Sequence, residues 1–382
     1  MAGLLGHQRR SAALHDLLYS ESADEAFEAS REFGISLALV YATADETLFT
    51  VTGPLPVRQT PGGSVVPGDQ VFDGSSPEAE WNGFVPYGES DWDGDGFLDD
   101  ADVPQADETR DTSSAANQEI AYDTDHYIGH TSAGPERAKR IEDEITSTIN
   151  AGDPIDLAFA EDMMLDVRDE RAAAIVPDIV AVAEDCGDAD LEAAAATLDA
   201  WDYRMTRDSE AALIFHQWLG HYRSSITGSP GAWVAVTLPP DSILFNSEDR
   251  QTKLLNALSA ALADIASNGW SVYGDWNTTK RANHPFGDIV PQLNYPEIPV
   301  DGSAGTVNNF RAEFEPMFAA GATFRMAVDL EGPATTMLPG GNSGDPTSEH
   351  FIDQFEGFFN GQHRPMRSRE RWATDDDLRP GG

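Results

Sequence analysis

The amino-acid sequence predicts an α+β fold, in which helices and strands occupy different stretches of the chain. Residues 135–223 carry a long block of helical periodicity, whereas residues 34–53 form two β-rich runs around a turn. The C-terminal part combines a strand over 321–330 with a short helix over 348–360. Because strands and helices do not alternate one by one, this order favours α+β over a parallel α/β sheet. A hydrophobic content of 40% is enough to form a buried core.

The N-terminal elements are predicted from apolar spacing and turn residues. Apolar residues recur at helical spacing up to Leu18, and residues 24–32 indicate a second helix. The two β-rich runs that follow meet at Ala44-Asp45, so we expect them to form a hairpin. Residues 54–111 are rich in Gly, Pro and Asp without periodicity, which predicts a long irregular connection.

The central block divides into four predicted helices. Asp and Glu gather at the helix starts, where they interact favourably with the helix dipole. A fifth helix is predicted over 248–266, and the Pro- and Gly-rich stretch 339–344 predicts a turn before the last helix. The four helices of the block are expected over 136–149, 160–185, 190–205 and 209–223.

The charge balance excludes several classes of partner. The chain has 66 Asp and Glu against 24 Lys and Arg, which gives a formal net charge of −42. Nucleic acid is excluded as a general partner because its binding needs clustered basic side chains, and anionic membrane surfaces are disfavoured. No apolar run approaches the ~18 residues that indicate a membrane-spanning helix. The single cysteine, Cys186, excludes an internal disulfide framework and a multi-cysteine zinc site.

The basic residues point to adaptation to salt. Only Lys139, Lys253 and Lys280 are lysines, and all other basic residues are arginines. So large a net charge opposes compaction by self-repulsion, which is screened within ~3 Å at 1 M salt. We therefore predict a halophilic source, with an acidic protein from a non-halophile as the alternative. No signal-peptide pattern precedes the first helix, so the chain as it stands is expected to be cytoplasmic.

A dense acidic segment, DWDGDGFLDDAD (91–102), has the spacing of a calcium-binding loop. Oxygen ligands at alternate positions converge on one cation because the loop winds around it, and Gly96 permits the sharp turn. Aspartate stands in the last position, where the longer glutamate is more common. The alternative is an acidic, salt-adapted loop without a metal. The expected calcium ligands are Asp91, Asp93, Asp95, the Phe97 carbonyl, Asp99 and Asp102.

Six separated segments carry further motifs. One is the tail, where FRMAVDL is followed by a closing segment from PGGNSG to HRPM. The other five are AEWNGFVPYGES (79–90), SSAANQEI (113–120), GPERAKRI (134–141), LDAWDYRMTRDSEAALIFHQW (198–218) and GSAGTVNNF (302–310). Together these segments resemble the penicillin acylases, which are N-terminal nucleophile hydrolases. They occur in the family's order and span nearly the whole chain.

The resemblance implies part of the family's αββα sandwich, together with the large helical block. Family members are cut into a small and a large subunit, and the large subunit begins with a serine that is activated by its own α-amine. Residues 1–382 resemble the C-terminal two-thirds of that large subunit. The resemblance thus implies that the nucleophile comes from sequence not present here, that the upstream half of the enzyme is the expected partner, and that this chain alone is inactive. Family members are often exported.

Two candidate site residues follow from the resemblance. Asn117 matches the oxyanion-hole asparagine, a donor that contributes ~3 kcal/mol to transition-state stabilisation. The alternative is an ordinary loop asparagine. Arg137 matches an arginine that lies near the nucleophile and this asparagine. Its alternative is a helix-surface arginine that pairs with Glu136 or Asp143.

Two functional hypotheses remain open. The first is part of a penicillin acylase-like hydrolase that cleaves linear amide bonds in penicillins, N-acyl homoserine lactones or related acyl amides through an acyl-enzyme. The second is a non-catalytic product of a split or decaying gene, which includes a calcium-binding folded module. A Ser-His-Asp triad is disfavoured, because the chain has no G-x-S-x-G motif and its histidines are scattered.

Overall fold

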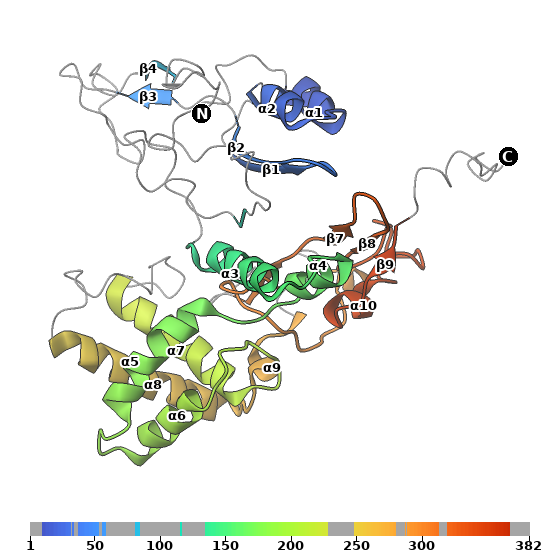
Figure 1. Cartoon of the computed structure of the whole chain (residues 1–382). Helices are drawn as coiled ribbons and strands as arrows, with labels where there is room; N and C mark the ends of the chain where they lie inside the picture. Colours follow the sequence, from blue (N-terminus) through green and yellow to red (C-terminus); the bar gives the residue numbers. More distant parts are fainter. Residues whose placement is uncertain are drawn as a thin grey trace. The chain divides into compact units, whose positions relative to one another are not determined.

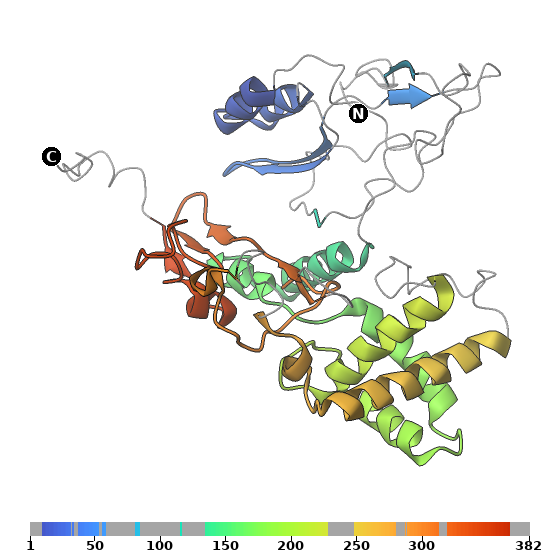
Figure 2. The same cartoon turned by 180° about the vertical axis from the view of Figure 1, so that it is seen from behind.

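The computed structural model divides into two compact units, Met1–Ile145 and Thr146–Gly382. Figures 1 and 2 show the chain from opposite sides, coloured from blue at the N-terminus to red at the C-terminus. Each unit contains helices and small antiparallel sheets, which confirms the predicted α+β class. The structure describes residues 10–31, 33, 37–52, 56–58, 81–84, 115–116, 134–227, 248–279, 287, 289–312 and 319–366.

The first unit begins with two helices and a β-hairpin, as the sequence predicts. The hairpin strands run antiparallel with Ala38 opposite Val51. The Thr43 N–H donates to the Glu46 carbonyl at 2.9 Å, which closes the turn between them. The bounds are α1 Arg10–Leu18, α2 Ala23–Arg31, β1 Ala38–Ala42 and β2 Thr47–Val51.

Helix α2 packs on the hairpin through a small apolar cluster. Ala26 and Phe27 of α2 and Leu48 of β2 are buried, and Tyr41 of β1 packs against them. The Tyr41 hydroxyl donates to the Ser20 carbonyl at 2.8 Å, which attaches β1 to the connection between the helices. The apolar residues of α2 and those of the two strands therefore pack against each other in one cluster.

The stretch 54–111, which was predicted to be irregular, contains an antiparallel strand pair. Strand β3, Pro56–Arg58, pairs with β4, Trp81–Phe84. Strands of three and four residues are too short to show a clear alternation, so the sequence did not indicate them. The acidic segment 91–102 lies outside the described residues. Helix α3, Glu136–Ala151, spans the boundary between the two units.

The helical block contains one helix more than predicted. A single helix over 160–185 is wrong, because α4 is capped at Leu165 and α5 starts after Asp169. Between them Arg168 forms a β-bridge with Arg204, and Asp169 caps the new helix by accepting a backbone N–H. The bounds are α4 Leu157–Met164, α5 Glu170–Ala183, α6 Ala189–Asp199, α7 Glu210–Thr227, α8 Glu248–Asn268 and α9 Tyr273–Trp276.

The main hydrophobic core lies between α5, α6, α7 and α8. Helices α7 and α8 run side by side in both views (Figures 1 and 2), and the Trp218 indole N–H donates to the Leu254 carbonyl at 3.2 Å. Each large apolar side chain buried here contributes ~1.5–3 kcal/mol. Core members with less than 2% exposure include Ile179, Leu198, Phe215, Trp218 and Leu254.

The C-terminal part forms a strand pair β5-β6 and an antiparallel sheet in the order β7-β8-β9. The strand predicted over 321–330 is confirmed over four residues, but the helix predicted over 348–360 forms only in its second half. Asp345 and Ser348 accept N–H groups two residues ahead, which competes with helix formation. No helix of the described ranges is long and apolar enough to cross a bilayer. The bounds are β5 Phe310–Ala312, β6 Ala319–Gly321, β7 Arg325–Val328, β8 Ala334–Met337, α10 Phe355–Phe359 and β9 Arg364–Pro365.

Candidate functional site

Arg137 belongs to the predicted catalytic pair and lies among the described residues. It is the second residue of α3 and is half-buried. Its Nη2 donates to the carbonyl oxygen of Ala116 at 2.7 Å. Ala116 directly precedes Asn117, which lies outside the described residues. The structure therefore brings Arg137 to the segment that contains the predicted oxyanion donor.

This contact restrains the backbone at Ala116. The Arg137 guanidinium holds the Ala116 carbonyl oxygen from the first turn of α3. Hydrogen bonds to charged groups contribute ~1.5–3 kcal/mol, which is enough to favour one orientation of a loop.

The other cations of the same helix pair locally. Lys139 Nζ lies 2.8 and 2.6 Å from the two carboxylate oxygens of Asp143. Arg140 forms an ion pair with Glu144, also four residues ahead. The exposed pair of Lys139 and Asp143 contributes at most ~1 kcal/mol. Arg137 differs because its guanidinium reaches a loop 21 residues earlier in the chain.

The predicted calcium loop 91–102 lies outside the described residues, so its six ligands stay a prediction. Among the residues that the structure does describe, no group of three or more His, Cys, Asp or Glu side chains is placed to hold a metal ion. The described part of the chain therefore adds no second candidate metal centre to the one predicted from the acidic spacing.

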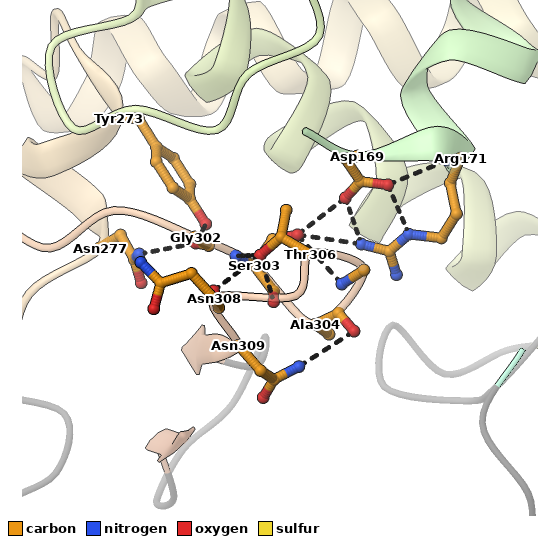
Figure 3. Close-up of polar contacts among 11 residues, drawn as sticks. Asp169, Arg171, Tyr273, Asn277, Gly302, Ser303, Ala304, Thr306, Asn308 and Asn309 are labelled. Atoms are coloured by element: carbon orange, nitrogen blue, oxygen red, sulfur yellow. Dashed lines mark hydrogen bonds and ion pairs between the residues drawn. The ribbon is translucent and has the colours of Figure 1, made fainter. Parts of the chain in front are cut away.

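A polar cluster that was not predicted lies where the start of α5 meets residues 302–309 (Figure 3). The Asp169 carboxylate accepts from Arg171 Nε at 2.9 Å, from Arg171 Nη2 at 2.6 Å and from Ser303 Oγ at 2.7 Å. Both charged side chains are almost fully buried, with 0% and 5% exposure. Burial by itself raises the pKa of Asp169, but the charge of Arg171 and these hydrogen bonds outweigh it and lower the pKa. The cluster thus contains a buried, fully ionised pair.

Gly302 joins this cluster to α9 (Figure 3). Its carbonyl accepts from the Tyr273 hydroxyl at 2.9 Å and from Asn277 Nδ2 at 3.1 Å, and its N–H donates to the Met205 carbonyl at 2.8 Å. Its φ of +94° strains any residue with a Cβ. Burial, followed by the charge of Asp169, raises the pKa of Tyr273, so the phenol stays protonated and donates.

The bonding of this cluster identifies it as a scaffold. Ser303 Oγ donates to a carboxylate of lowered pKa, which is a weak base, and accepts from the Gly305 N–H at 3.1 Å. Among the residues that the structure describes, this hydroxyl has no partner that could activate it as a nucleophile. Sequence analysis missed the cluster because Asp169 and Ser303 are 134 residues apart. The one sequence feature that pointed to this region was the motif segment GSAGTVNNF, which contains Ser303.

Comparison with known proteins identifies the family to which this chain belongs. The structure matches a thermostable penicillin G acylase from Alcaligenes faecalis with a TM-score of 0.53 and 15% sequence identity. The match covers 98% of this chain and 72% of that chain, and it shows a shared fold. The family model for penicillin amidase matches residues 2–374. The chain therefore belongs to the penicillin amidase family of hydrolases, which confirms the resemblance of the six segments.

Proposed function

We propose that the chain is part of a penicillin acylase-like hydrolase that cleaves linear amide bonds through an acyl-enzyme. The candidate substrates are penicillins, N-acyl homoserine lactones and related acyl amides. In this proposal Asn117 donates a hydrogen bond to the oxyanion, and Arg137 positions the Asn117 segment. An N-terminal serine from sequence outside these 382 residues supplies the nucleophile.

The proposed reaction has two halves. The serine hydroxyl gives its proton to its own α-amine, whose pKa near ~8 suits a base at neutral pH, and attacks the amide carbon. Negative charge develops on the carbonyl oxygen, where the Asn117 amide stabilises it. The C–N bond then breaks, the leaving amine takes the proton, and the acyl group stays on serine. Water attacks this ester in the second half, which releases the acid and restores the hydroxyl.

The observation that carries the proposal is the 2.7 Å hydrogen bond from Arg137 to the Ala116 carbonyl. It attaches a half-buried guanidinium to the backbone directly before the proposed oxyanion donor. A fixed positive charge at this position favours an anionic intermediate and keeps a nearby amine unprotonated. Both effects serve the proposed acyl transfer.

The test uses the chain co-expressed with an upstream segment that begins its large-subunit part with serine. Hydrolysis of a chromogenic phenylacetyl anilide is measured. Asn117→Ala is expected to lower kcat by ~10²–10³ with a much smaller change in KM. Arg137→Gln is expected to lower kcat by less, because it acts through the loop. Lys139→Gln, an exposed neighbour on the same helix, is the matched control and is expected to leave turnover unchanged.

The outcomes separate the parts of the proposal. Unchanged turnover in a folded Asn117→Ala variant would show that SSAANQEI does not supply the oxyanion donor. The chain alone is expected to be inactive, so hydrolysis by the purified chain would reveal a nucleophile within it. If the correctly assembled protein hydrolyses no acyl amide, the non-catalytic hypothesis is favoured instead.

A further inference from the structure

Arg325 is a buried cation at the start of strand β7. Its exposed fraction is 4%. Its Nη2 donates to Asn308 Oδ1 at 3.0 Å, its Nη1 donates to the Phe358 carbonyl, and its Cζ lies 3.9 Å from the centre of the Phe358 ring. The third nitrogen, Nε, is buried and its N–H has no hydrogen-bond partner in the described part of the chain.

The contacts that hold the Arg325 guanidinium come from neutral groups. Across the described ranges no carboxylate forms an ion pair with it. By contrast, Arg171 and Arg207 are held by Asp169 at 2.6 Å and by Asp301 at 2.7 Å. Burial lowers the pKa of Arg325 to about 10, so the guanidinium is still protonated at neutral pH. Charges buried to this degree are normally paired, because their desolvation is unfavourable.

Arg325 lines a small hollow, with Asn309 and Phe310 among the other walls. The volume of this cavity is about 10 Å³. It can hold one small species but not an acyl amide. Asp301 also lines the hollow, but its oxygens accept from the Arg207 backbone at 2.6 Å and from the Arg207 guanidinium at 2.7 Å. That carboxylate is already neutralised and does not compensate Arg325.

We propose that this hollow binds a single halide ion, chloride under ordinary conditions, on the guanidinium of Arg325. A halide accepts the hydrogen bond of the unpartnered Nε–H and also neutralises the charge. A water molecule would satisfy the donor but leave the charge unpaired. Apolar walls from Phe310 and Phe359 lower the local dielectric, which strengthens the attraction between the ion and the guanidinium.

Chloride binding is measured by the line width of ³⁵Cl in NMR, with sodium sulfate to hold the ionic strength constant. The net charge of −42 repels anions and keeps non-specific binding low. The parent chain is expected to broaden the signal, Arg325→Gln to lose this broadening, and Arg364→Gln to keep it. Arg364 is the matched control because it lies on β9 of the same sheet and is 54% exposed. Broadening that survives in a folded Arg325→Gln variant, or its absence in the parent chain, would overturn the proposal.

A second measurement needs only the parent chain and stays decisive if Arg325→Gln does not fold. Bromide replaces chloride in halide sites and gives an anomalous signal in diffraction. Crystals grown in bromide are expected to show an anomalous peak within contact distance of Arg325 Nε. An ordered peak there without anomalous signal would identify a water molecule and overturn the proposal.

Discussion

Replacement of Asp169 by alanine tests how much the buried ion pair stabilises the second unit. Asp169 caps α5 by accepting the Arg171 backbone N–H at 3.0 Å, and it also neutralises the Arg171 guanidinium. Alanine removes both interactions. Asp188 is the matched control, because it caps α6 in the same way, with the Asp190 N–H at 3.0 Å, but is exposed to solvent.

The expected loss in the free energy of unfolding follows from the burial of Asp169 and Arg171. Loss of an aspartate cap lowers the free energy of unfolding by ~1 kcal/mol, which is the whole effect expected for Asp188→Ala. In Asp169→Ala, Arg171 loses the carboxylate that holds it, although only 5% of its side chain is exposed. Removal of one partner from such a pair costs ~3–5 kcal/mol, so the total loss is roughly 4–6 kcal/mol. Since typical stabilities are ~5–15 kcal/mol, this one change removes a large part of the total.

The assay is urea unfolding of the whole chain at pH 7 and constant salt, followed by tryptophan fluorescence. The pKa of Asp169 is lowered in the folded state, so its contribution is present above its unfolded value of ~3.9 and is lost as the pH falls through the folded value. Measurement at pH 7 therefore captures the full effect. If Asp169→Ala lowers the free energy of unfolding no more than Asp188→Ala does, the reasoning is refuted. Asp169→Leu combined with Arg171→Met is expected to recover much of the loss, because an apolar pair can replace a buried ion pair.

Three further predictions concern the same scaffold and the acidic loop. Gly302→Ala is expected to lower the urea midpoint, because a Cβ at φ +94° would lie 2.0 Å from a backbone carbonyl oxygen; an unchanged midpoint would contradict this. Burial and the charge of Asp169 raise the pKa of Tyr273, so its contribution is fully present below the unfolded value of ~10 and is lost as the pH rises above it. Between pH 9 and 11, Tyr273→Phe is therefore expected to flatten the decline in stability, and an equal slope in both proteins would count against it. Asp91→Ala with Asp93→Ala is expected to abolish calcium binding in calorimetry, and a parent chain without a calcium-specific heat would disprove the loop.

The fold was predictable where a periodic pattern ran over several residues. The hairpin was found because two β-rich runs meet at the turn residues Ala44-Asp45, and the strands pair across that turn. The boundary between α4 and α5 was not found, because apolar spacing continues through the residues that separate them. The residues between the two helices include Arg168, which forms a long-range β-bridge with Arg204, and Asp169, which caps the start of α5. Local pattern carries no information on a partner 36 residues away.

In the candidate site, too, local sequence indicated single residues but not their long-range partners. The sequence indicated Arg137 through its segment, but the carbonyl that it binds belongs to a loop 21 residues earlier. The scaffold of Asp169 and Ser303 could not be predicted, because each residue alone has an ordinary local role. An aspartate before a helix predicts a cap, and a serine between glycines predicts a turn. Only the fold shows that these two side chains meet.

Arg137 and Arg171 occupy equivalent helix positions, and their differences support different roles. Each is the second residue of its helix, where a cation opposes the helix dipole by ~0.3–1 kcal/mol. Neither position therefore favours helix formation, and both guanidiniums instead contact a distant loop. Arg171 is buried against a carboxylate, so its removal threatens the fold. Arg137 is half-buried and donates to a backbone carbonyl, so its replacement is expected to perturb the core less than that of Arg171. This separation makes Arg137 a suitable residue for testing function apart from stability.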